Sequence, residues 1–387
     1  MDNPTPHTSR RLIPASTWAL MIGAWVVVGL FFAFGNRWLA VPIDPVTASL
    51  VFVGLFVTIL AASFGVVREA DHLAHQLGEP YGTLILTLSI VSIEVILIAS
   101  VLLGPAEVPT IGRDSIFAVM MIILNLVMGI CLVAGAARNG DQEYNAQGAV
   151  TYLSMIVLLT GTALVLPKFT SGAGEFTRTQ AIAMSVLTAL LYAAFLWKQM
   201  SSYRRLFIQP EPGAMAIGHA ASSGVDATDG GGQPLDRKAM LVRSAVLLVL
   251  ILPIVLLAHF LAVVTDYGIA AMGAPAAVGG VLIAIIVFTP ESITAVKAAM
   301  NNEMQRAINL CLGAFVSTVG LTVPAVLIIG LVTGKQVVMG ISLVEIVLFA
   351  LTVALTMKTF NGQRTSPIQG FMHIALFVVF GLLLFNP

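Results

Sequence analysis

Charged residues are scarce in this chain: Lys, Arg, Asp and Glu together make up 10% of 387 residues, whereas hydrophobic residues make up 58%. A soluble domain has about 25% charged residues. The formal net charge is zero, so no excess charge attracts nucleic acid or an acidic partner. A mean hydropathy of +0.96 indicates a polytopic membrane protein whose surroundings are membrane lipid. The sequence alone assigns no oligomeric state.

Cysteine is almost absent as well. Cys131 and Cys311 both lie in apolar runs, and this number and placement exclude a disulfide framework and a zinc-ribbon spacing. We interpret both as small buried side chains. The apolar runs also lack a nucleophile paired with a base, and lack two His one turn apart beside an acid, which argues against an intramembrane hydrolase. The sequence therefore predicts neither an enzyme nor a resident cofactor.

Long apolar runs make up most of the chain. A helix needs about 20 apolar residues to cross the hydrocarbon core of a bilayer. Runs of about this length cover Ser16–Phe34, Pro45–Val67, Gly82–Leu103, Ser115–Ala136, Gly148–Leu166, Thr179–Trp197, Ala239–Val263, Pro275–Met300, Ala307–Val332, Val338–Thr356 and Ile368–Phe385. The sequence predicts an all-α polytopic membrane protein in which about eleven transmembrane helices form a single transport domain over residues 1–387.

Lys and Arg are distributed unevenly between the loops. With the N-terminus in the cytoplasm, fourteen of the 19 fall on the cytoplasmic side and five on the outer side. Cytoplasmic loops are enriched in these residues. The bias predicts a cytoplasmic N-terminus and an outer C-terminus, and we interpret the first run as a retained helix because it is too long for a signal-peptide core.

A polar, Gly-rich segment, residues 198–238, divides the chain and is predicted to be a flexible cytoplasmic linker. Five predicted helices lie on each side of it, in 45–197 and in 239–387, and the first helix is an extra one. Two related halves with an odd number of crossings must be inverted relative to each other in the membrane. The predicted architecture is therefore one N-terminal helix followed by two inverted five-helix repeats.

A short internal similarity supports this division. Placing Glu94 over Glu291, an offset of 197, also superposes Gly82 on Gly279 and Ser92 on Thr289. Each segment then has a Gly, eleven intervening residues and a Glu. Both acids fall on the second helix of their half, where an inverted repeat needs them.

Three acids lie inside predicted spans: Glu94, Glu291 and Glu345. A carboxylate in hydrocarbon is costly, so such an acid marks the path of an ion or a proton. Glu94 is the thirteenth residue of its predicted helix, about 18 Å from the helix start and near mid-membrane. Glu94 and Glu291 are the predicted ion- and proton-binding residues, including for Ca²⁺. Glu345 lies nearer a helix start, where a vestibule or structural role fits as well as transport.

Oxygen atoms surround the two central acids in the sequence. Pro290 clashes with the carbonyl of the preceding turn, around Ile286, which predicts free carbonyl oxygens beside Glu291. Ca²⁺ takes six to eight oxygen ligands. The predicted supporting oxygens belong to Ser89, Ser92, Asn125, Thr289, Ser292 and Ser317, with Thr318 and Thr322 as further candidates. The alternatives are a Pro-kinked helix with a paired Glu, and hydroxyl groups that bond back to their own helix.

Histidines occur in two settings. His72, His75 and Glu79 lie in a charged segment before the third helix, which we interpret as a solvated amphipathic helix, with pH sensing as the second interpretation. His259 and His373 lie in apolar runs without metal-ligand spacing. We interpret these two as neutral, hydrogen-bonded core residues.

Two segments carry a resemblance to a known family. The sequence HQLGEPYG, residues 75–82, leads to Glu94, and ESITAV, residues 291–296, is followed by AMNN, residues 299–302. Here the chain resembles the cation/calcium exchangers, and within them the bacterial calcium/proton antiporters of the Cha type. The resemblance implies an antiporter of the bacterial inner membrane. It would export Ca²⁺, with Na⁺ or K⁺ as further substrates, in exchange for H⁺ by alternating access at Glu94 and Glu291.

Other functions are weighed against this one. Many plant and fungal relatives carry Gly-Asn before each acid, whereas this chain has Val91-Ser92 and Thr289-Pro290. Fewer amide oxygens favour an alternative, a Na⁺ or K⁺/proton antiporter with little calcium activity. An ion channel and a structural membrane subunit are the remaining alternatives, and dependence of flux on a counter-ion distinguishes exchange from conduction.

Overall fold

The computed structural model describes residues 13–77, 81–104, 108–170, 172–210, 237–362 and 364–386. Apart from two isolated β-bridges, regular structure in these ranges is helical. The helices are α1 (Ala15–Trp38), α2 (Pro45–Leu77), α3 (Tyr81–Leu102), α4 (Ile111–Met120), α5 (Met128–Asn139), α6 (Ala146–Thr160), α7 (Arg178–Met200), α8 (Arg237–Met272), α9 (Ala277–Met300), α10 (Met304–Thr333), α11 (Leu343–Thr359) and α12 (Pro367–Phe385). The π-helix η1 (Met121–Val127) joins α4 to α5, so these two form one continuous helix. The described residues therefore contain eleven long helices, the number predicted from the sequence.

Nine of the described helices are long and apolar enough to cross a membrane. The fold class is therefore the predicted one, an all-α polytopic membrane protein. Cys131 and Cys311 are both free and buried, as their apolar surroundings predicted.

Two helices extend past their predicted ends. The helix α2 continues ten residues beyond Val67, and α8 continues nine beyond Val263. Each extension contains charged residues, among them Arg68 and Asp266, that made the sequence resemble a loop. A helix tolerates such residues when their side chains face an ion partner or a cavity.

The predicted linker starts later than expected. The helix α7 runs to Met200 and a 3₁₀ turn, η4, covers Arg204–Phe207. Leu206 is buried, and the side chain of Gln209 accepts a hydrogen bond from the backbone N–H of Gln305 at 2.7 Å. Leu206 and Gln209 thus hold the segment around η4 against the bundle, and residues 211–236 of the predicted linker lie outside the described residues.

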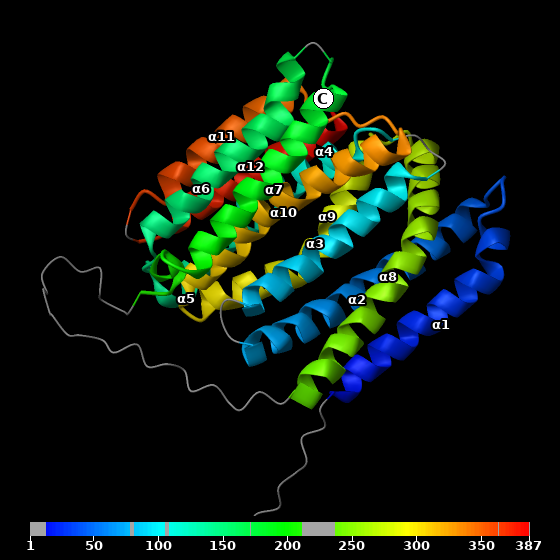
Figure 1. Cartoon of the computed structure of the whole chain (residues 1–387), viewed down its shortest axis with the longest axis horizontal. Helices are drawn as coiled ribbons and strands as arrows, with labels where there is room; N and C mark the ends of the chain where they lie inside the picture. Colours follow the sequence, from blue (N-terminus) through cyan, green and yellow to red (C-terminus); the bar gives the residue numbers. More distant parts are fainter. Residues whose placement is uncertain are drawn as a thin grey trace, which may run out of the picture.

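The helices form three groups (Figure 1). The helices α1, α2 and α8 lie on one side of the molecule, α6, α7, α11 and α12 lie on the other, and α3, α9 and α10 lie between them. Packing between the halves is reciprocal: α3 contacts α10 while α9 contacts α4 and α5, and α7 contacts α10 while α12 contacts α5. The central acids therefore lie on helices surrounded by others.

A buried ion pair joins the first group. Arg243 Nη1 of α8 lies 2.8 Å from Glu69 Oε2 of α2, and Thr17 of α1 donates to Glu69 Oε1 at 3.1 Å. Trp25 of α1 also donates through Nε1 to the carbonyl of Val249 on α8. Glu69 is fully buried, so the interpretation of its segment as solvated is wrong at this position.

Candidate functional site

Two glutamates occupy the middle of the bundle. Glu94 lies on α3 and Glu291 on α9, and the two helices contact each other and run in opposite directions (Figure 1). Both side chains are buried, and they lie close enough for the charge of one to act on the other. Two carboxyl groups in one buried location need protons or cations to balance their charge.

Glu94 receives its hydrogen bond from the other half of the chain. Thr318 of α10 donates through Oγ1 to Glu94 Oε2 at 3.1 Å. Thr322, one turn further along α10, lies beside the same carboxyl group, and its hydroxyl has no hydrogen-bond partner among the described residues. Glu94 Oε1 is buried and likewise lacks a described partner. One carboxylate oxygen of Glu94 therefore stays available.

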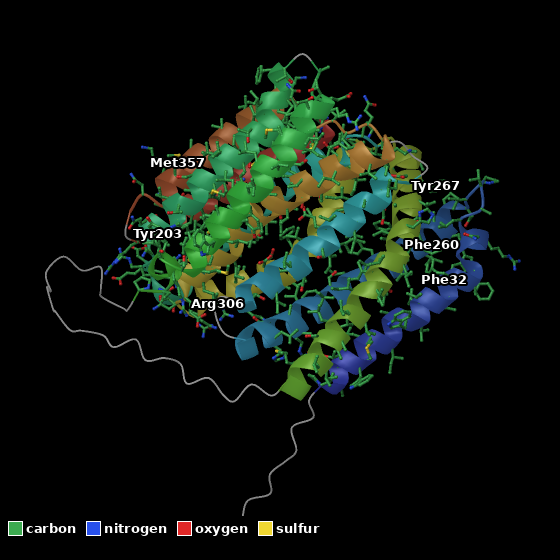
Figure 2. The ribbon with its side chains drawn as sticks, viewed as in Figure 1. Phe32, Tyr203, Phe260, Tyr267, Arg306 and Met357 are labelled. Carbon is green, nitrogen blue, oxygen red and sulfur yellow. The ribbon has the colours of Figure 1, made fainter. Side chains whose placement is uncertain are left out.

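Glu291 lines a large cavity of about 650 Å³. Basic residues line the same cavity where α2 and α9 end and α10 begins: Arg68, Arg204, Lys297 and Arg306. We call this the basic end of the bundle; Figure 2 shows Arg306 there, with Tyr267 toward the opposite end. Glu291 Oε2 is buried without a hydrogen-bond partner in the described part of the chain. The cavity thus leads from the basic end to a carboxyl group with an available oxygen.

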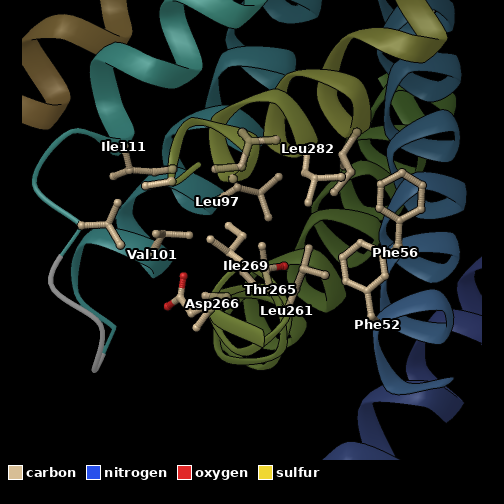
Figure 3. Close-up of a pocket in the computed structure, with 18 residues that line it drawn as sticks. Phe52, Phe56, Leu97, Val101, Ile111, Leu261, Thr265, Asp266, Ile269 and Leu282 are labelled. Atoms are coloured by element: carbon tan, nitrogen blue, oxygen red, sulfur yellow. The ribbon is translucent and has the colours of Figure 1, made fainter. Parts of the chain in front are cut away.

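A second, small cavity of about 210 Å³ lies toward the opposite end (Figure 3). It is lined by Leu97, three residues past Glu94, and by Ile286, five residues before Glu291. At 1.5 Å per helical residue these positions are about 5 and 8 Å along the helix axes from the acids. Its lining also includes Asp266 of α8. The two glutamates therefore lie between two cavities that approach from opposite ends.

A family model described as "Sodium/calcium exchanger protein" matches residues 47–200 and 243–386, which is more than half of the chain. The chain belongs to the sodium/calcium exchanger family. It is accordingly a membrane transporter and not an enzyme, and the resemblance to cation/calcium exchangers is confirmed.

Relatives of this exchanger include two curated bacterial proteins and a solved structure. It is 32% identical over 374 residues to the putative ionic transporter y4hA of Sinorhizobium fredii, covering 96% of each chain. It is 32% identical over 327 residues to the sodium-potassium/proton antiporter ChaA of Escherichia coli, covering 84% of this chain and 86% of the relative. The structure of the Ca²⁺/H⁺ antiporter YfkE shares the fold, with a TM-score of 0.70, 19% identity and coverage of 96% and 99%.

Most predicted supporting hydroxyls of the exchanger bond to their own helix. Each donates to a carbonyl three or four residues earlier, at 2.5 to 2.9 Å. This set comprises Ser89, Ser92, Thr289, Ser292 and Ser317. Such back-bonding was the stated alternative for each hydroxyl. Thr318, a further candidate, is the hydroxyl that the structure brings to a central carboxylate.

Asn125 lies on η1 and its amide is directed to α11 and α12. Its Nδ2 donates to Thr352 Oγ1 at 3.0 Å, and its Oδ1 lies 3.2 Å from His373 Nδ1. His373 Nε2 lies 3.0 Å from Thr359 Oγ1. His373 is thus the buried, hydrogen-bonded residue that was expected, whereas the amide of Asn125 is engaged away from the two glutamates.

Pro290 and Glu345 have distinct local roles. The helix α9 continues through Pro290, whose carbonyl accepts a hydrogen bond from Thr294. Glu345 Oε2 accepts from the backbone N–H of Ser342 at 2.7 Å and completes a capping box at the start of α11. This contact supports the structural role considered for Glu345, and its role in transport stays a prediction.

The remaining histidines lie apart from the glutamates. His72 is half-buried near the end of α2, beside the ion pair of Glu69 and Arg243. The side chain of His75 and the whole of Glu79 lie outside the described residues. His259 is exposed on α8 with its ring edge toward Phe260, so its interpretation as a core residue is wrong.

Asp266 is the intramembrane acid that sequence reasoning missed. The predicted span ended at Val263 because Asp266, Tyr267 and Gly268 resemble a helix end, but α8 continues to Met272. Tyr267 donates its hydroxyl to the carbonyl of Ile43 at 2.9 Å, which fixes this last part of α8 against the chain before α2. The signal available in the sequence was the apolar run from Ile269 to Met272, which extends the helix pattern past the acid.

Proposed function

We propose that this exchanger is a secondary antiporter that moves a cation in exchange for protons by alternating access at Glu94 and Glu291. The observation that supports this most is the pair of buried, interacting carboxyl groups inside the bundle, each with one oxygen lacking a described partner. Such oxygens bind either a proton or a cation, and both neutralise the buried charge. Competition for the same oxygens couples the two fluxes.

Charge balance favours a divalent substrate. One Ca²⁺ that replaces two protons leaves the pair of Glu94 and Glu291 electrically unchanged. One Na⁺ or K⁺ that replaces two protons leaves a net negative charge, which costs several kcal/mol when buried and unpaired. The same monovalent ion is balanced when one carboxyl group keeps its proton. We therefore propose Ca²⁺ as the preferred substrate, with Na⁺ and K⁺ carried at higher concentration.

The two cavities give the proposed access routes. The large cavity reaches Glu291 from the basic end, and the small cavity approaches from the other end without including either glutamate in its lining. We assign this arrangement to the state open at the basic end. The Lys and Arg distribution makes that end cytoplasmic, with the N-terminus also in the cytoplasm and the C-terminus outside, in the bacterial inner membrane.

Inverted repeats supply the change of access. The two segments that match the family model, 47–200 and 243–386, correspond to the two predicted five-helix halves. The reciprocal contacts of α3 with α10 and of α9 with α4 and α5 are those that a twofold axis in the membrane plane would generate. Exchanging the conformations of the halves would close the large cavity and open the small one.

A monovalent cation/proton antiporter is the second candidate. The relative from Escherichia coli, 32% identical, is named a sodium-potassium/proton antiporter. The amide of Asn125 is engaged by Thr352 and His373, so it is one oxygen fewer to complete the coordination of Ca²⁺. Both features favour an ion that demands fewer ligands.

Proton flux from everted vesicles tests both candidates. Vesicles are acidified inside, and Ca²⁺, Na⁺ or K⁺ is added outside while the pH gradient is followed with a dye. We expect Ca²⁺ to collapse the gradient at a lower concentration than Na⁺ or K⁺, and all three to act at lower concentration as the external pH rises. Inert Ca²⁺ with active Na⁺ or K⁺ would favour the second candidate. Cation flux without any counter-ion dependence would indicate a channel, and no flux would leave a structural subunit.

A further inference from the structure

Asp266 is a half-buried acid that the proposed exchange at Glu94 and Glu291 does not use. It lies on α8, six residues before the helix end, and lines the small cavity (Figure 3). Its Oδ2 is buried and has no hydrogen-bond partner within the described ranges. A carboxylate in such a location is costly unless it is neutralised. The buried Oδ2 is therefore open to a ligand that neutralises it.

The small cavity fits a proton better than a metal cation. Apart from Asp266 and Thr265, its lining side chains are apolar, and Asp266 is the one ionisable residue among those described there. The facing residues of α2, α3, α4 and α9, including Phe56, Leu97 and Ile111, carry no titratable group. A cation such as Ca²⁺ requires six to eight oxygens, whereas a proton requires one.

The position of the cavity connects Asp266 to the central pair. Leu97 and Ile286 line the cavity about one turn from Glu94 and one and a half turns from Glu291. Asp266 lies on the same cavity toward the opposite end of the bundle from Arg306. The Asp266 carboxyl group is therefore the ionisable group on the wall of the cavity that approaches the glutamates from this end.

We propose that Asp266 is a proton-binding site of the second access route, which accepts a proton at the end opposite the basic end and passes it to the Glu94 and Glu291 pair. The proton moves from water to an Asp266 oxygen and then to a glutamate oxygen, and Asp266 returns to its starting state. This inference rests on the proposed cation/proton exchange. It assigns to α8 a part in proton delivery that is separate from cation binding.

The experiment compares Asp266→Asn, Asp266→Glu and Thr265→Val in proteoliposomes with a determined orientation. The pH is varied on one face while the other is held constant, and cation-driven exchange is recorded. We expect that in Asp266→Asn the exchange rate no longer responds to pH on the face opposite the basic end, where α8 ends at Met272. Its response to pH on the basic face and its half-maximal cation concentration should stay unchanged. Asp266→Glu, which retains a carboxyl group, should restore the response, and Thr265→Val should resemble the wild type.

Distinct outcomes would overturn the inference. If Asp266→Asn keeps the wild-type response to pH on both faces, the Asp266 carboxyl group carries no proton. The same follows if Thr265→Val loses the response to pH as fully as Asp266→Asn does. A changed half-maximal cation concentration would assign Asp266 to the cation instead. If Asp266→Asn fails to fold, a folded Asp266→Glu with no pH response on this face would overturn it equally. Absence of exchange in the wild type would refute the proposed cation/proton exchange itself. This outcome is distinguishable from a failure of the Asp266 proposal, in which the wild type still exchanges.

Discussion

Replacing Thr318 by Val tests whether a hydroxyl from the second half of the chain stabilises the ionised carboxyl group of Glu94 in the first half. Thr318 donates to Glu94 Oε2 at 3.1 Å, and Val removes the hydroxyl while nearly preserving the shape of the side chain. A hydrogen bond to a charged group contributes about 1.5 to 3 kcal/mol, and one to a neutral group about 0.5 to 1.5 kcal/mol. The ionised, cation-binding form of Glu94 thus loses about 1 to 1.5 kcal/mol more than the protonated form.

A difference of about 1.4 kcal/mol corresponds to a factor of ten in an equilibrium constant. We therefore expect Thr318→Val to raise the half-maximal cation concentration by about tenfold at constant pH, measured in the vesicle assay. Ser317→Ala is the matched control on α10, because the hydroxyl of Ser317 bonds to its own helix. An unchanged half-maximal concentration in Thr318→Val, or an equal rise in the control, would refute the reasoning.

Three further variants test the remaining roles. Glu94→Gln and Glu291→Gln should each abolish exchange while the protein stays folded and inserted, because an amide cannot exchange a proton for a cation. Near wild-type exchange in either variant would show that the replaced residue does not belong to the site. Pro290→Ala should weaken cation binding in the vesicle assay, since a regular helix turn withdraws carbonyl oxygens, and an unchanged half-maximal concentration would make Pro290 a packing residue. Glu345→Ala should lower the stability of the folded protein by about 0.5 to 2 kcal/mol in thermal unfolding through loss of the capping box, whereas a lost cation response in folded protein would argue for a transport role.

The helices were predictable because bilayer thickness imposes a minimum apolar length that the sequence displays directly. The buried position of Glu94 followed from its distance along the predicted helix, whereas its pairing with Glu291 as one ion site stays a prediction. Helix ends were less predictable. Asp266 and Glu69 look like loop residues until their environment is known, since a cavity in one case and Arg243 in the other allows the helix to continue.

Hydroxyl and amide directions could not be predicted from the sequence. A Ser or Thr in a helix can bond to its own backbone or to a neighbour, and the choice depends on packing. Thr318 and Ser317 are adjacent on α10, yet Thr318 reaches Glu94 while Ser317 bonds back. The direction of Asn125 depends on Thr352 and His373, two residues more than 200 positions away that no local pattern connects to it.

The buried ion pair between α2 and α8 offers a way to observe the transport cycle by spectroscopy. Separating Glu69 from Arg243 would leave a buried charge unpaired, at a cost of about 3 to 5 kcal/mol, so α1, α2 and α8 should travel together as one body. Phe32 is exposed on α1, at the periphery of the bundle (Figure 2). Because both native cysteines are buried, a fluorophore or spin label attached after Phe32→Cys would report the movement of this body from the periphery without touching the ion path.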